Sequence, residues 1–352
     1  NKVLYKRFYL IEESMKKVSG NVLLLKEANT NIIRKAFKQR QTATVQQLAR
    51  ITGLTAVTVN SILQQLLENQ EIFEAEKLPS GGGRPAQLYR FNNGFAHAAV
   101  IFAHEIDNDD IVFDRAADLA GNPVFSEEKA LPRVRMSDFE PIVERLLTQV
   151  PAVKAIGFGL PGVEYEGKLL SDYSGLNGHG FLDHFRMKYG LPVIFENDVN
   201  AACLGYCARK RIDPSATLLY LYFPQKYIPG TAIFIDGKIQ KGFRNYAGEI
   251  RKNTFDIPWT DPEFQRDNVV FCDKISRFIT GICAILSPEK VVLSGNLIHA
   301  DNTERIRSLC ESRFDPNTIQ EICLTESFNK DYETGIIAAT LEVLEPKLFL
   351  QK

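Results

Sequence analysis

The pattern of apolar residues near the start of the chain predicts three successive helices. Within residues 29–40, one helical face is formed by Ile32, Ile33, Ala36 and Phe37. Thr44 begins the next helix, where Gln47 completes a capping box, and Gly53 ends it. A third helix begins at Thr55, and its buried stripe consists of Val59, Ile62, Leu63, Leu66 and Leu67. Two helices joined by a short turn around a glycine form a helix-turn-helix.

The opposite face of the third helix is polar and almost uncharged. It carries Ala56, Val57, Thr58, Asn60, Ser61, Gln64 and Gln65. Short polar side chains of this kind can approach base edges closely in the major groove of DNA. We therefore expect DNA contacts from Thr55, Ala56, Thr58, Asn60, Ser61 and Gln64.

Two predicted strands with a glycine-rich turn follow these helices. Residues 71–78 (EIFEAEKL) and 85–91 (PAQLYRF) flank the turn SGGGR, and this order of helices and hairpin predicts a winged helix. Three consecutive glycines allow the tip of the wing to approach a phosphate backbone or a minor groove, and Arg84 stands where it would make that contact. The alternative is a helical hairpin that mediates protein contacts.

From residue 94 onward, predicted strands alternate with predicted helices. We expect strands at 98–106, 110–125, 153–162, 191–198, 217–223, 231–239 and 289–295, with a hairpin turn at Asp236-Gly237. We expect helices at 139–150, 200–211, 268–286 and 331–349. This pattern predicts an α/β body of two lobes with a cleft between them.

The charge of the chain is unevenly distributed. Residues 1–90 hold 14 Lys and Arg against 7 Asp and Glu, a net charge of +7, which leaves −8 for the rest of a chain whose formal charge is −1. A basic first module favours an anionic partner such as double-stranded DNA, although ordinary surface variation is the alternative.

The composition excludes secreted, membrane and disulfide-rich proteins. Of the 352 residues, 45% are hydrophobic and 24% charged, and no apolar run approaches the roughly 20 residues that span a bilayer. The first residues lack the apolar core of a signal peptide, and the six cysteines form no CxxC pair. We expect buried thiols in a cytoplasmic protein.

Four segments of the body resemble the ROK family of repressors and sugar kinases. They are AIGFGLPGVEYEGKLL, GLPVIFENDVNAACLG, IDGKIQKGFRNYAGEI and SPEKVVLSGNL, in that order, and the wing sequence SGGGRPAQLYRF is similar to the repressor branch. The resemblance covers roughly residues 21–345. It implies an actin/hexokinase-like two-lobed body, a sugar in the cleft and a homodimeric repressor of sugar-utilisation genes.

The resemblance also suggests how the domains are divided. We expect an N-terminal helical extension at 1–20, a winged helix at 21–92, a first lobe at 93–205 plus 331–352, and a second lobe at 206–330.

The two glycine turns that hold phosphate in the kinase branch are replaced here. FAHEIDND (102–109) and PQKYIPG (224–230) stand at the matching places, and the second contains prolines and bulky side chains. Phosphoryl transfer depends on backbone N–H groups that cradle the phosphates. We therefore expect no catalytic residues, no cofactor and no ATP binding.

The resemblance assigns the sugar contacts to Asn197, Asp198 and Glu249. In the family's kinases the Asp of the Asn-Asp pair is the general base, and here the pair could form a clamp for hydroxyl groups. The alternative is that Asn197 and Asp198 only cap the following helix. Asn177 and His179, near the family's sugar loop, are further candidates, and His179 could equally face solvent.

The zinc site of the family is not expected in this chain. Arg251 and Lys252 follow Glu249 and Ile250 where the family has a histidine, and the expected cysteine cluster is missing. The two cations would suit a sugar phosphate or sugar acid, or they form a solvated surface.

These observations favour a dimeric repressor that binds a palindromic DNA operator and senses a sugar or sugar derivative. An active sugar kinase with an accessory DNA-binding domain is one alternative, and a dimeric regulator that responds to no effector is another.

The two kinds of DNA contact predict different effects of substitution. Arg84→Ala should weaken binding across many sequences and flatten its salt dependence, because the expected contact is to the backbone or minor groove. Asn60→Ala or Gln64→Ala should instead change sequence preference, by roughly 1–3 kcal/mol per lost base contact. Salt titrations on a panel of DNA duplexes measure both. If Arg84→Ala changed neither affinity nor salt slope, the wing assignment would be wrong.

Overall fold

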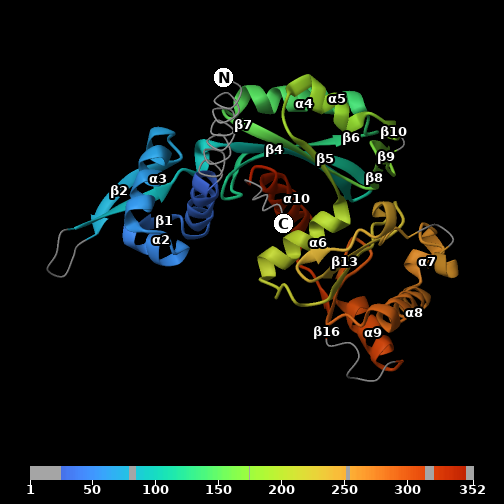
Figure 1. Cartoon of the computed structure of the whole chain (residues 1–352). Coiled ribbons are helices and arrows are strands. Elements are labelled where there is room, and N and C mark those ends of the chain that lie inside the picture. Colours follow the sequence, from blue (N-terminus) through green and yellow to red (C-terminus); the bar gives the residue numbers. More distant parts are fainter. Residues whose placement is uncertain (1–24, 79–84, 174, 251–253, 314–320, 346–352) are drawn as a thin grey trace, which may run out of the picture. The chain divides into compact units, whose positions relative to one another are not determined.

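The computed structural model describes residues 25–78, 85–173, 175–250, 254–313 and 321–345 (Figure 1). The chain divides into two compact units, one that runs to Phe95 and includes Glu345, and one formed by Ala96–Leu344. The predicted extension at residues 1–20 lies outside the described residues, and the domain boundaries proposed from the sequence stay predictions.

The first unit contains the predicted order of helices followed by a hairpin. Residues 25–40 are helical and are followed by β1 (Thr42–Thr44), α2 (Val45–Thr52), α3 (Ala56–Glu68), β2 (Ile72–Leu78) and β3 (Ala86–Phe91). The three strands form an antiparallel sheet in the order β1-β3-β2. The apolar core of the first unit includes Ile33, Phe37, Leu48, Val59, Ile62, Leu63 and Leu66.

The helix ends of this unit follow from local chemistry. The Thr44 hydroxyl accepts from the Gln47 backbone N–H at 3.3 Å, and the Gln47 side chain accepts from the Thr44 N–H at 2.9 Å, so the predicted capping box is confirmed. Gly53 ends α2 in the left-handed conformation, with φ 72°. Thr55 caps α3 as predicted, because its hydroxyl accepts from the Thr58 N–H.

The second unit is built around two five-stranded sheets. The first has the order β11-β7-β4-β5-β6, formed by Val193–Asn197, Val153–Leu160, His97–Ile106, Asp109–Asp118 and Pro123–Leu131. The second has the order β14-β13-β12-β15-β16, formed by Lys238–Ile239, Gly230–Ile235, Leu218–Tyr222, Lys290–Ser294 and Glu321–Leu324. A small antiparallel sheet connects β8 (Val163–Tyr165), β9 (Lys168–Leu170) and β10 (Gly178–His179).

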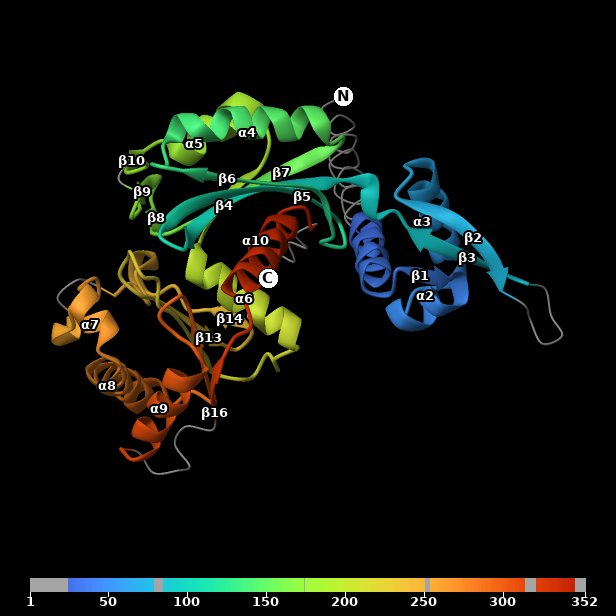
Figure 2. The ribbon, with the colours of Figure 1, turned by 180° about the vertical axis from the view of Figure 1, so that it is seen from behind.

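Helices separate and cover the two sheets of this unit. Figures 1 and 2 show α6 (Asp198–Lys210) and α10 (Phe328–Glu342) between the sheets, and one apolar core joins these helices to both. The outer face of the first sheet is covered by α4 (Met136–Gln149) and α5 (Phe181–Tyr189). On the second sheet, α8 (Asn268–Leu286) and α9 (Ala300–Glu311) share a third core, with the short α7 (Pro262–Arg266) beside them.

Two predicted elements of the body are corrected by the structure. Residues 110–125 are not one strand, because β5 ends at Asp118 and β6 begins at Pro123. The Asp118 carboxylate accepts from the backbone N–H groups of Ala120 and Asn122, both at 2.9 Å, and this turn reverses the chain. The last helix runs from Phe328 to Glu342 rather than from 331 to 349, since Ser327 caps its start and Pro346 follows its end.

The crossing of α6 and α10 depends on two glycines. A Cβ atom added to Gly205 would lie 1.8 Å from the Asp331 carbonyl oxygen, and one added to Gly335 would lie 1.7 Å from the Ala201 carbonyl oxygen. Each helix therefore needs a residue without a side chain where its backbone meets the other.

Asp331 adds a polar connection at this crossing. Its fully buried carboxylate accepts from the Tyr220 hydroxyl at 3.0 Å and the Thr325 hydroxyl at 2.6 Å, and it forms an ion pair with Arg209. These partners come from β12, from the residue after β16 and from α6, so one carboxylate joins α10 to the second sheet and to α6.

The crossing predicts a large difference between two glycine-to-alanine changes. Gly205→Ala should lower the free energy of unfolding by about 3 kcal/mol or more, because the new methyl group overlaps backbone that cannot move away. Gly281→Ala, in the middle of α8, meets no atom within 4 Å and should stabilise by about 0.5–1 kcal/mol. Urea unfolding of both variants measures the difference. Equal effects would contradict the close approach of α6 and α10.

Candidate functional site

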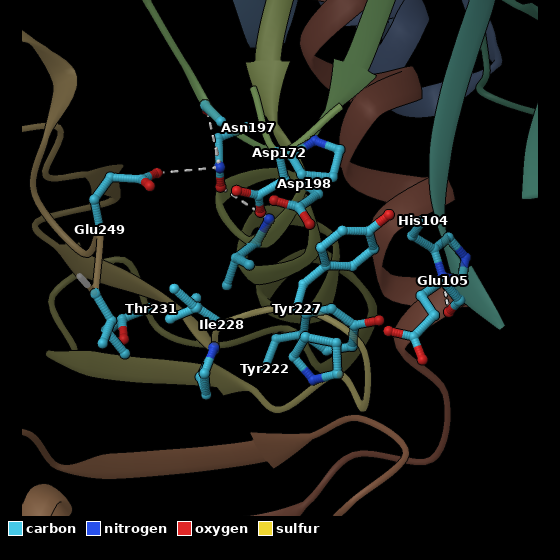
Figure 3. A pocket seen from close by; sticks show the side chains of 17 residues that line it. His104, Glu105, Asp172, Asn197, Asp198, Tyr222, Tyr227, Ile228, Thr231 and Glu249 are labelled. Atoms are coloured by element: carbon cyan, nitrogen blue, oxygen red, sulfur yellow. Dashed lines mark hydrogen bonds between the residues drawn. The ribbon is translucent and has the colours of Figure 1, made fainter. Parts of the chain in front are cut away.

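A cavity of about 450 Å³ lies in the second unit, where strands of both sheets end (Figure 3). It is lined by residues from β4, the loop after β7, the start of α6, the end of β12 and the loop that leads into β13. Its volume is in the range of small-molecule sites. Three of the predicted effector contacts, Asn197, Asp198 and Glu249, line this cavity together.

Asn197 is the residue that caps α6. Its side-chain oxygen accepts from the backbone N–H groups of Val199 at 2.9 Å and Asn200 at 3.0 Å. Its amide nitrogen donates to the Gly162 carbonyl at 3.1 Å and lies 3.5 Å from a Glu249 carboxylate oxygen. The cap alternative therefore holds for Asn197, which also positions Glu249 beside the cavity.

Asp198 is the first residue of α6 and does not cap it. Its side chain is buried, and it faces the cavity in Figure 3. Burial raises the pKa of Asp198 to about 8; the backbone N–H of Val199 opposes the shift, and the nearby carboxylates of Asp172 and Glu249 add to it. At pH 7 this carboxyl is mostly protonated, so it offers a ligand both an O–H donor and a carbonyl acceptor.

The other two predicted contacts lie away from the cavity lining. Asn177 is exposed, and its side-chain oxygen accepts from the Ser171 backbone N–H at 2.6 Å. His179 is exposed on the short strand β10. Arg251 and Lys252 lie outside the described residues. The structure thus groups Asn197, Asp198 and Glu249 and leaves Asn177 and His179 apart from them.

The two segments that the sequence analysis matched to phosphate turns are joined to each other by hydrogen bonds. The Glu105 carboxylate accepts from the Lys226 backbone N–H at 2.8 Å. The Asp110 carboxylate accepts from the Lys226 ammonium at 2.9 Å and from the Tyr227 hydroxyl at 2.9 Å. The β4–β5 hairpin is therefore joined to the loop 224–230.

Sequence reasoning missed several residues that line the cavity. They are His104, Glu105, Asp172, Tyr222, Tyr227, Ile228 and Thr231. One signal was present, because His104 and Glu105 interrupt an otherwise apolar predicted strand. The contribution of the loop residues depends on long-range contacts that the local sequence does not reveal.

The described residues contain no group of three or more His, Cys, Asp or Glu side chains that could hold a metal ion. All six cysteines are unpaired thiols, five of them buried and Cys323 half-buried.

The predicted DNA-reading face lies on α3. Thr55, Ala56, Asn60, Ser61 and Gln64 are exposed, while Thr58 is half-buried and its hydroxyl is 2.9 Å from that of Thr55. The helix contains no Lys or Arg. Arg84 falls outside the described residues, so its expected contact stays a prediction.

The raised pKa of Asp198 predicts a pH-dependent effect on stability. An acid whose pKa is higher in the folded chain keeps its proton longer when folded, so the free energy of unfolding falls as pH rises from about 4 to about 8. Asp198→Asn removes this titration. The melting temperature of Asp198→Asn relative to that of the wild type should therefore rise as the pH is raised from about 5 to about 8. Asp301→Asn, an exposed change in the first turn of α9, is the matched control. A constant difference across this range would contradict a protonated Asp198.

Within the part of the chain that the structure describes, no helix is both long and apolar enough to cross a bilayer.

Sequence comparison relates about two thirds or more of the chain to proteins named xylose repressor. No family model matches it. It is 22% identical over 269 residues to the xylose repressor of Caldicellulosiruptor bescii, an alignment that covers 73% of this chain and 64% of that protein. It is 23% identical over 246 residues to the xylose repressor of Bacillus subtilis, covering 66% and 62%. The chain thus spans less than two thirds of the length of these relatives.

Structural comparison extends over both units. A ROK family transcriptional regulator described as a homologue of the E. coli MLC protein superposes with a TM-score of 0.64, at 15% identity, over 91% of this chain and 98% of that one. The ROK hexokinase of Thermus thermophilus superposes with a TM-score of 0.54, at 16% identity, over 71% of this chain and all of that one. The chain therefore has the fold of the ROK proteins, and the resemblance to their repressor branch that its motifs indicated is confirmed.

Proposed function

We propose that this chain is a DNA-binding repressor of sugar-utilisation genes whose kinase-like body senses a sugar and transfers no phosphate. The observation that carries the proposal is the cavity. It brings together Asp198 and Glu249, whose carboxyl groups suit hydroxyl binding, while Lys226 and Tyr227, in the segment matched to a phosphate turn, are bound to Asp110. In this proposal the protein acts in the cytoplasm, where its DNA lies.

The cavity chemistry suits a polyhydroxylated ligand. A protonated Asp198 donates and accepts, the Glu249 carboxylate accepts, and the Thr231 hydroxyl offers both. Tyr222, Tyr227 and Ile228 supply the apolar surface on which the C–H face of a sugar can pack.

The first unit supplies the proposed DNA contacts. An exposed face of short side chains on α3 suits insertion into a major groove, and the hairpin of β2 and β3 follows it as a wing does. A homodimer with two such helices would bind a palindromic operator, because the symmetry of the site mirrors that of the protein. The names of the xylose repressors and of the ROK regulator agree with this function.

The sugar-kinase alternative rests on the shared fold and on Asp198 at the place of the general base. It requires a site for the phosphates of ATP. The donors of this region are engaged by carboxylates of the chain itself. The Lys226 ammonium forms an ion pair with Asp110, and the Lys226 N–H donates to Glu105, so neither is available to a phosphate in this arrangement. An ATP-turnover assay with a panel of sugars tests this alternative directly, and turnover would overturn the proposal.

The proposal predicts that Asp198→Ala separates sensing from DNA binding. The substitution should leave operator affinity without sugar within about twofold, because Asp198 belongs to the second unit and acts only when hydroxyl groups are present. The sugar concentration that releases DNA should rise more than about tenfold, since a buried hydrogen-bonding group is lost.

Fluorescence anisotropy on an operator selected from random DNA measures both quantities, with D-xylose, D-glucose and D-mannose as probes. Asn177→Ala is the control from outside the cavity lining and should release DNA like the wild type. Release by Asp198→Ala at the wild-type sugar concentration would contradict the clamp. Release of the wild type by no probe would favour the regulator that responds to no effector.

A further inference from the structure

One end of the cavity is formed by a buried carboxylate that the sugar contacts leave unused. Glu105, near the end of β4, is only 3% exposed and lines the cavity. Figure 3 shows its carboxylate directed toward the tyrosine side chains of Tyr222 and Tyr227, across the cavity from Glu249. Burial raises the pKa of Glu105, and Lys226 opposes the shift.

The two oxygens of this carboxylate are in different situations. Oε2 accepts from the Lys226 backbone N–H at 2.8 Å, which fixes the orientation of the group. Oε1 is buried and has no hydrogen-bond partner among the described residues. A buried acceptor left unpaired is costly, so a donor is expected opposite this oxygen when the site is in use.

Three neighbouring side chains already use their donors elsewhere, and the backbone N–H of Gln225 also acts on the Glu105 carboxylate and lowers its pKa. The Lys226 ammonium and the Tyr227 hydroxyl both bind Asp110. The two ring nitrogens of His104 lie 3.0 Å from the Glu105 carbonyl oxygen and 3.1 Å from the Asn329 side-chain oxygen. Oε1 is thus left without a partner among the described residues, and a molecule in the cavity can supply the missing donor.

A second orphaned group supports a ligand of this kind. The Thr231 hydroxyl, on β13, also lines the cavity and is buried without a partner in the described part of the chain. Unpaired polar atoms thus face the cavity from β4 of the first sheet and from β13 of the second. A ligand that satisfies both must carry hydrogen-bonding groups at two separated positions.

We propose that Glu105 forms a second polar subsite of the cavity, which accepts a hydrogen bond from a hydroxyl or ammonium group of the ligand and selects against phosphorylated sugars. This inference rests on the proposed sugar-sensing function and names its ligand class. The family resemblance matches this segment to a phosphate turn of the kinases, but a phosphate needs donors, whereas Glu105 and Asp110 are acceptors and Asp110 binds the Lys226 ammonium. An ammonium group at this position gains a charge-assisted hydrogen bond.

The test compares neutral, cationic and anionic forms of the same sugar. The neutral probes are D-glucose, D-mannose and D-xylose, and each is compared with its terminal phosphate ester and its terminal amino-deoxy derivative. Isothermal titration of the full chain at pH 8 should show the amino derivative of the preferred sugar binding roughly tenfold more tightly than the sugar itself. The phosphate ester should bind at least roughly tenfold more weakly.

Glu105→Gln assigns the effect to this residue. The Gln oxygen can still accept from the Lys226 N–H, which turns its NH₂ group toward the cavity and replaces an acceptor by a donor. The preference for the amino derivative should disappear and the exclusion of the phosphate ester should weaken. Glu164→Gln is the matched control, because that carboxylate also holds a backbone N–H, of Gly167 at 2.8 Å, but does not line the cavity.

Each outcome of these titrations supports or overturns the proposed subsite. A wild type that binds the phosphate ester as tightly as the sugar, or gains nothing from the amine, overturns the subsite without any variant. A ranking that persists in Glu105→Gln overturns the role of Glu105. In both cases, sugar binding that depends on Asp198 leaves the proposed function intact. If no probe binds at all, the proposed sensor and the subsite are both overturned.

Discussion

The contact on which the rest of the second unit depends is the backbone-to-backbone crossing of α6 and α10. Gly205 and Gly335 allow the helices to meet without side chains between them, and the Asp331 carboxylate binds Arg209, Tyr220 and Thr325 beside the crossing. Because one apolar core joins these helices to both sheets, their crossing fixes the position of one sheet relative to the other. It also fixes the N-terminus of α6, where Asp198 faces the cavity. A ligand that moved Asp198 would therefore act on the element that holds the two sheets together.

The proposed function requires that changes in two loops turn a phosphate-transferring fold into a sensor. A kinase needs backbone donors and positive charge where the phosphates lie. In this chain the β4–β5 hairpin carries the carboxylates of Glu105 and Asp110. Lys226 and Tyr227, in the loop 224–230, donate hydrogen bonds to them. These contacts run between the two sheets, so the region stabilises their relative position without a nucleotide. In the proposed function, the end of the cavity with Asp198 and Glu249 binds hydroxyl groups, and binding is thereby separated from catalysis.

Much of the fold could be predicted from the sequence because its signals are local. The capping box at Thr44 and Gln47, the left-handed Gly53 and the helix at 268–286 depend on nearest neighbours, and the structure reproduces them. The single strand predicted at 110–125 was wrong because the Asp118 turn depends on one side chain. For the site, Asn197, Asp198 and Glu249 were predicted through the family resemblance. The place of Glu105 in the cavity lining could not be predicted, because its orientation depends on a hydrogen bond from Lys226, which is 121 residues away along the chain.

Asn197 and Asp198 are adjacent but make different contacts. Because of this difference, a substitution of Asp198 tests ligand binding more directly than a substitution of Asn197. Asn197 uses its oxygen on two N–H groups of α6 and its nitrogen on Gly162 and Glu249. Its loss would uncap the helix and release Glu249 together, so a changed response in such a variant would not reveal its cause. Asp198 makes no cap, and its raised pKa shows that folding disfavours its charged form. The position of Asp198 thus costs stability when the carboxyl is ionised, whereas its neutral form can bind a hydroxyl group in the cavity as donor and acceptor at once.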